Sequence, residues 1–339
     1  MNKTSSIELI PEDKRNVWDV ILSETEQNDP LWCDIEGLIS EIVFQKDGSG
    51  SRLDSVYSLT GLAIDPSNSN QSFRPKDDLY EFVSKRFGKE DVSQEELTGF
   101  LLSSLKDYEH IFASYLKEQV KKDDEYREKA HAHFAAIRDD CIEKSQQKNY
   151  GSSILNFNYT TPFMLEDPGL GIVGARNVHG ILGRTETIFG IDGKDVPEDN
   201  PALSFTKTYR LMSLVPYENE TVKLCDSDTS YIKIFGHSLS RADYSYFQSI
   251  FDTVNLYGCD TKLVFMYKSY PNKSNELIDE QAILEELYSR ISHLLNEYGS
   301  TLDNKDHGKN LMHKLLLEQK LLIKRINVKS HLPTNVYSH

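Results

Sequence analysis

The residues of this sequence that could carry out chemistry gather in three short segments between positions 156 and 247. The first, NFNYTT at 156–161, closes an expected strand. The amide of Asn158 can both donate and accept hydrogen bonds, so it could orient a ribose hydroxyl or a water molecule. The alternative is an Asx turn that simply ends the strand. Both interpretations of Asn158 stay open at this stage.

The second segment is NVHGIL at 177–182, followed by TIFGID at 187–192. His179 stands before a glycine at an expected strand end, and a neutral imidazole is the usual general base near neutral pH. Gly180 would let a ligand or another backbone come close. The alternative is a hydrogen-bonded structural histidine in a hairpin.

The third segment, IFGHSL at 234–239, leads from an expected strand into a helix that begins near Asp243. Free amides at a helix N-terminus can bind a phosphate or a ribose, and a carboxylate there suits the helix dipole. The candidate nucleotide-binding residues are therefore Gly236, His237, Ser238 and Asp243. Alternatively, Ser238 and Asp243 are only helix caps.

Other reaction types find little support. His131 and His133 stand two positions apart on an expected helix and face different sides, which is a poor metal geometry. The GHSLS segment matches the G-x-S-x-G elbow only to its fourth residue, and no Walker loop or G-x-G-x-x-G is present. We therefore expect no metal site and no resident cofactor.

Positioning these segments requires a parallel sheet. Five apolar runs predict strands: ILNFNY, NVHGIL, TIFGID, YIKIFG and KLVFMY. A helix between the last two predicts a right-handed βαβ unit. Helical spacing begins near Ser93, where Ser93 and Glu96 fit a capping box, and a second helical run covers about 123–147. A C-terminal helix is expected to end at Gly299, and a further helical run covers 311–323.

The predicted fold class is α/β, with a small parallel, Rossmann-like sheet core flanked by long helices. Residues 1–148 form a mainly helical region with a loop-rich stretch near 47–86, residues 149–270 form the α/β core, and residues 271–339 are helical. Ligands of such sheets bind at the carboxyl ends of the strands. We therefore expect Asn158, His179 and Ser238 to converge on one cleft.

Charge and composition exclude several partners. The chain has 38 Lys and Arg against 53 Asp and Glu, a net charge of -15, which disfavours bulk nucleic-acid binding. No apolar run is long enough for a membrane span or a signal peptide. The four cysteines have neither zinc-ribbon nor disulfide-framework spacing. These features predict a cytoplasmic protein; the cysteines are Cys33, Cys141, Cys225 and Cys259.

Five segments resemble the bacteriophage abortive-infection AbiH family. They are LWCDIE at 31–36, FNYTTP at 157–162, NVHG at 177–180, IFGID at 188–192 and FGHSLSRADYSYF at 235–247. The resemblance implies phage defence, in which an infected cell stops growing before phage can spread. AbiH proteins in turn resemble sirtuin-like effectors that hydrolyse NAD. Carried over, the catalytic residues would be Asn158 and His179, with Gly236 and Ser238 on the ribose of the NAD substrate.

The sequence departs from the family at two points: residues 1–30 lack a GNGFD-like turn, and Thr160 replaces an Asp. The missing turn indicates a shortened chain, a companion subunit that supplies the turn, or a lost activity. If the protein is an enzyme, it is expected to be NAD glycohydrolase-like. The alternative is a non-enzymatic regulatory or phage-sensing subunit, and a nucleic-acid-targeting toxin is disfavoured. Expected partners are a phage-derived trigger and a companion subunit or second copy.

Overall fold

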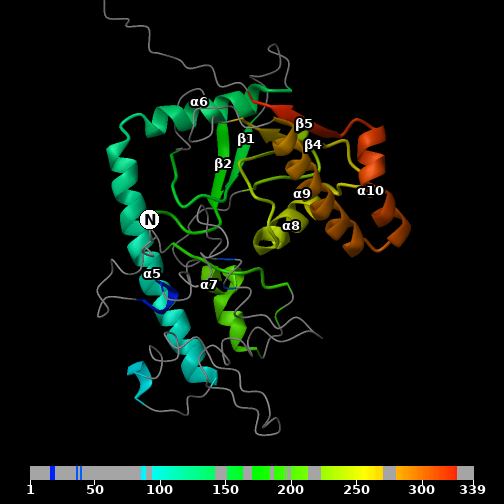
Figure 1. The fold of residues 1–339 in the computed structure, drawn as a ribbon. Helices are drawn as coiled ribbons and strands as arrows, with labels where there is room; N and C mark the ends of the chain where they lie inside the picture. Colours follow the sequence, from blue (N-terminus) through cyan, green and yellow to red (C-terminus); the bar gives the residue numbers. More distant parts are fainter. Residues whose placement is uncertain are drawn as a thin grey trace, which may run out of the picture. The chain divides into compact units, whose positions relative to one another are not determined.

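The computed structural model is an α/β protein, which confirms the predicted fold class (Figure 1). The structure describes residues 16–19, 36, 39, 85–88, 94–141, 151–162, 170–183, 187–194, 196, 200–212, 223–269 and 280–326. Of the loop-rich stretch predicted near 47–86, only residues 85 and 86 are described. Ser93 of the predicted capping box lies outside the described residues. In the described part of the chain, no helix is both long and apolar enough to cross a membrane.

The chain divides into two compact units, which we describe separately. The first unit comprises residues 1–118 and 179–218, and the second comprises 119–178 and 219–339. Helix α5 (Gln94–Lys122) begins in the first unit and ends in the second.

In the first unit, helix α5 is joined by a 3₁₀ helix, η4 (Pro201–Phe205), and by α7 (Lys207–Met212). Trp18 is fully buried and donates from Nε1 to the carbonyl of Leu101 at 3.0 Å. Ile39 is also buried, so residues of the N-terminal region belong to this core.

The second unit contains two parallel sheets. Strand β1 (Ser152–Asn156) pairs with β2 (Ile172–Asn177). The other sheet has the order β3 (Tyr231–Phe235), β4 (Lys262–Tyr267) and β5 (Leu321–Arg325). Helix α8 (Tyr244–Val254) connects β3 to β4, as the predicted βαβ unit requires.

The central strand β4 is covered on both faces. Leu263 and Phe265 belong to a core cluster with residues of α8, α9 (Glu280–Thr301) and α10 (Lys305–Leu317). Val264 and Met266, which alternate with them, pack on the opposite side with Ile137 of α6 (Tyr126–Asp139). A strand buried on both faces reads as one continuous apolar run, which is why KLVFMY was recognisable.

Three of the predicted elements are wrong. NVHGIL is not a strand, because β2 precedes it and ends at Asn177. TIFGID makes only an isolated bridge between Ile191 and Thr206. The helical run 311–323 instead contains the end of α10 and the start of β5. Gln319 ends α10 with a φ of 54°, and Lys320 N donates to Leu315 O at 2.8 Å. This is a Schellman turn without its usual glycine, so no residue of the sequence signals the end of the helix.

Gly299 does not terminate α9, because it lies buried inside the helix at the crossing with α10. A Cβ on Gly308 would lie 2.0 Å from the carbonyl oxygen of Gly299, and one on Gly299 would lie 2.5 Å from that of Gly308. The two helix backbones therefore touch, and only glycine fits at either position.

We predict that Gly308→Ala lowers the free energy of unfolding by about 2 kcal/mol, because overpacking outweighs the gain in helix propensity. Gly99→Ala in α5 is the matched control, since a Cβ there meets nothing within 4 Å. That control should be neutral or stabilising by about 0.5 kcal/mol. Urea denaturation measures the stability of both variants. Equal denaturation midpoints for the two variants would contradict the close contact between the backbones of α9 and α10.

Lys233 of β3 binds the carbonyl groups at the C-terminal end of α6. Its Nζ donates to the carbonyl oxygens of Ile137 at 2.9 Å, Arg138 at 2.6 Å and Asp140 at 2.5 Å. These are carbonyls that a helix end leaves unsatisfied. Burial lowers the pKa of Lys233, and the neighbouring Cys141 and Asp140 oppose that shift.

We predict that Lys233→Met destabilises the protein by about 2 kcal/mol, since three carbonyls lose a charged donor. Lys262→Met is the matched control, because Lys262 is exposed and its Nζ lies over the same Tyr231 ring as that of Lys233. Hydrogen exchange read by mass spectrometry should show faster exchange in α6 for the first variant alone. Unchanged exchange in α6 would contradict this role of Lys233.

Candidate functional site

The turn that follows β1 is built around Asn156, not Asn158. The side chain of Asn156 is buried, and its Oδ1 accepts from the backbone N of Asn158 at 3.0 Å and from its Nδ2 at 3.2 Å. Its Nδ2 donates to Thr160 O at 2.8 Å. This is an Asx turn, and it leaves Asn158 exposed beyond the strand end.

The neighbouring strand end supports the same turn. Asn177, the last residue of β2, donates from Nδ2 to Asn158 O at 3.0 Å. Val178 N donates to Asn156 O at 3.1 Å. The NFNYTT and NVHG segments are therefore linked as far as Val178 by the parallel pairing of β1 with β2.

The turn that follows β3 carries the GHS segment. Gly236 and Leu239 have left-handed φ values of 67° and 56°. Leu239 N donates to His237 Nδ1 at 2.8 Å, and His237 Nε2 lies 3.3 Å from Asp243 Oδ2. Ser238 and Gly236 are exposed, whereas the side chains of His237 and Asp243 are 9% and 5% exposed. Asp243 makes no side-chain cap to α8, so the cap-only interpretation does not describe it.

Aromatic contacts join these two turns. The ring of Phe157 meets that of His237 edge-on, with 4.3 Å between centroids. Phe247 of α8 stacks on Phe157 at 5.7 Å and meets His237 edge-on at 5.0 Å. The carboxyl ends of β1 and β3 therefore lie next to each other. Five predicted site residues belong to this edge of the second unit: Asn158, Gly236, His237, Ser238 and Asp243.

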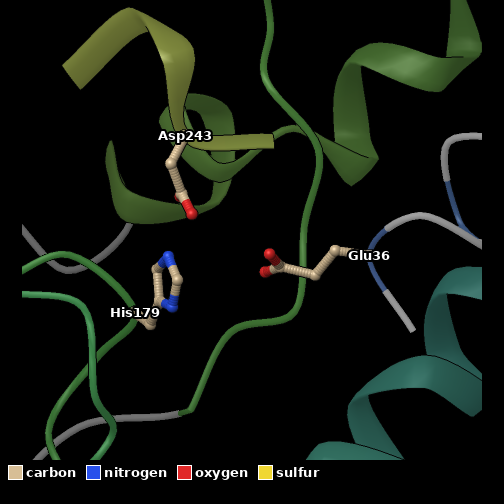
Figure 2. A group of neighbouring side chains, drawn as sticks. All are labelled: Glu36, His179 and Asp243. Atoms are coloured by element: carbon tan, nitrogen blue, oxygen red, sulfur yellow. The ribbon is translucent and has the colours of Figure 1, made fainter. Parts of the chain in front are cut away.

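His179 belongs to the first unit, so its predicted convergence with Asn158 and Ser238 stays a prediction. It is buried, with 5% exposure, and its carbonyl accepts from Ile188 N at 3.0 Å. A carboxylate oxygen of Glu36 lies within 4.8 Å of a His179 ring nitrogen. Figure 2 shows these two side chains facing one another; Asp243, also drawn there, belongs to the second unit.

The surroundings of Glu36 are strongly polar for a protein interior. Its Oε2 accepts from Lys207 Nζ at 2.8 Å, and its Oε1 accepts from Gly190 N at 3.3 Å. The Lys207 side chain is 2% exposed and that of Glu36 is 13% exposed. Neither residue was among the predicted site residues, although Glu36 closes the LWCDIE segment that supports the family resemblance.

A second buried ion pair holds the IFGID segment. Arg210 donates to both carboxylate oxygens of Glu109, including a 2.6 Å contact from Nη2, and to Phe189 O at 2.8 Å. Phe189 N donates to Glu109 Oε1 at 2.6 Å. A Cβ on Gly190 would lie 2.9 Å from Phe205 O. This family segment is therefore fixed from both sides by charged groups and close backbone contacts.

Parallel strands with polar turns at their carboxyl ends place the second unit in the α/β class, whose open sheets bind ligands at that edge when they bind them. The family model of bacteriophage abortive infection AbiH matches residues 7–267, and the chain belongs to this family. Neither the curated proteins nor the solved structures contain a significant match.

We predict that His179→Ala abolishes protection against phage while the fold is kept, as expected of a proton acceptor. His293→Ala on α9 is the control, because its side chain is 56% exposed. Plaque counts measure protection, and melting temperature measures folding. A collapsed melting temperature for His179→Ala would instead assign this buried residue a structural role.

Proposed function

We propose that this protein carries out abortive infection by hydrolysing NAD or a related nucleotide at the carboxyl edge of β1 and β3. Membership of the AbiH family supports the abortive-infection role. The observation that carries the proposal is the edge-on contact between Phe157 and His237. Through this contact two polar strand-end turns lie side by side and offer an exposed amide and an exposed hydroxyl.

Hydrolysis of the nicotinamide–ribose bond requires few protein groups. The bond between nicotinamide and C1 of the ribose breaks, its electron pair leaves with the nicotinamide, and positive charge develops on the sugar. A water oxygen then bonds to C1 and gives up a proton to a base. The protein must hold the ribose, orient the water and accept that proton.

Asn158 and Ser238 are suited to the holding and orienting steps. The Nδ2 of Asn158 donates to Asn156 Oδ1, and the Oδ1 of Asn158 can accept from a donor such as a ribose hydroxyl or water. The exposed Ser238 hydroxyl can both donate and accept. The proton acceptor implied by the resemblance is His179, whose part is tested by the variant described above.

A non-enzymatic role is the second candidate, and one observation favours it. His237 and Asp243, the titratable residues of the β3 turn, are directed at each other, and His237 also holds the backbone. Such a turn can bind a nucleotide without changing it. In that case the protein is a regulatory or phage-sensing subunit that uses the ligand as a signal.

An assay of nicotinamide release separates the two candidates. The purified full chain is incubated with NAD, alone and with lysate of phage-infected cells, and free nicotinamide is followed by chromatography. Hydrolysis should fall about 100-fold in Asn158→Ala and about 10-fold in Ser238→Ala, because orienting groups are lost. Ser249→Ala is the matched control, since Ser249 is an exposed residue of α8.

Calorimetry on the same samples completes the test. NAD binding without nicotinamide release would favour the regulatory subunit. Neither binding nor release, with or without infected-cell lysate, would overturn the proposal that NAD is the substrate.

A further inference from the structure

The two strand-end turns are built in the same way. After β1, the Asn156 side chain accepts from the backbone N of Asn158, two residues later, at 3.0 Å. After β3, the His237 side chain accepts from the backbone N of Leu239, also two residues later, at 2.8 Å. A histidine ring therefore takes the place that an asparagine amide has in the neighbouring turn.

This geometry fixes which ring nitrogen of His237 accepts from the backbone. A backbone N–H can only donate, so Nδ1 must be the unprotonated acceptor. The ring N–H is then on Nε2, which lies 3.3 Å from Asp243 Oδ2. Both nitrogens are engaged, and the side chain is 9% exposed.

The engaged ring holds a strained turn in place. Leu239 has a φ of 56°, a left-handed conformation that is unfavourable for a non-glycine residue. Its bond to His237, its burial at 6% exposure and the contact of Arg290 Nη1 with Ser238 O at 3.0 Å offset that cost. With the Ser238 carbonyl occupied in this way, its hydroxyl is the group that remains exposed for a ligand.

We infer that His237 is a positioning residue whose Nδ1 fixes the Gly236–Leu239 turn, so that Ser238 lies beside Asn158. The Phe157 ring, which follows Asn156 and contacts His237, transmits the order of one turn to the other. The inference rests on the proposed function for the ligand that the turns present. The sequence pattern predicts His237 as a nucleotide-binding residue; in the structure its ring nitrogens lie against Leu239 N and the Asp243 carboxylate.

Three substitutions distinguish positioning from ligand contact. His237→Asn keeps an acceptor where Nδ1 stands and can form the same turn as Asn156. His237→Gln moves its polar atoms one methylene further along the side chain, and His237→Ala removes them. By calorimetry on the full chain, the affinity for NAD should stay within about 3-fold for Asn and fall more than about 10-fold for Gln and Ala. Equal loss in all three variants would overturn the inference, and so would no loss in Ala.

A spectroscopic measurement decides the same point without NAD. Long-range ¹H–¹⁵N spectra of the ¹⁵N-labelled full chain should show His237 as the Nε2–H tautomer, with Nδ1 unprotonated. The Leu239 amide should exchange slowly in wild type and in His237→Asn, and faster in Gln and Ala. A protonated Nδ1 would overturn the inference. If wild type binds no NAD, the proposed function fails while this tautomer result still stands or falls by itself.

Discussion

The parallel pairing of strands is the constraint on which this structure depends. In a parallel sheet all carboxyl ends meet at one edge, so segments distant in sequence are brought together there. Asn156 and Asn177 are register partners at the ends of β1 and β2. The contact between Phe157 and His237 extends that edge to β3. Each polar turn is therefore placed by the strand that precedes it, and no separate scaffold is needed.

The sequence predicted those elements whose burial leaves a periodic pattern. The βαβ unit of β3, α8 and β4 was recognisable because β4 is buried on both faces and α8 has a clear apolar face. Strand β2 was missed because IVGARN has only one strongly apolar pair and alternates poorly. Strand β5 was missed because Gln319, not glycine, ends the helix before it.

The site was predictable in its residue types but not in its hydrogen bonds. The segments that carry Asn158 and Ser238 were found because they follow strands. Nothing in the sequence shows that Asn156 forms the turn while Asn158 is exposed, or that both nitrogens of His237 are engaged. Those facts depend on which donor reaches which acceptor, and side-chain amides and imidazoles can serve either purpose. The hydrogen bonds of Glu36 were likewise not predictable, because its partners Gly190 and Lys207 are more than 150 positions away.

The buried charges of the first unit show how a family segment can be constrained without touching a ligand. Glu109 with Arg210 and Glu36 with Lys207 are both largely removed from solvent, and such pairs contribute little net stability because desolvation offsets their attraction. Removing one partner is costly, however, since the other charge is left buried and unpaired. Both pairs also bind the backbone of Phe189 or Gly190. They therefore specify one path for the IFGID segment, and this segment begins nine residues after His179, whose carbonyl accepts from Ile188. The charge pairs in the core thus constrain the segment that contacts the backbone of His179, the predicted base. In the proposed arrangement, the contact of His237 with Leu239 N constrains the position of Ser238 in the same way.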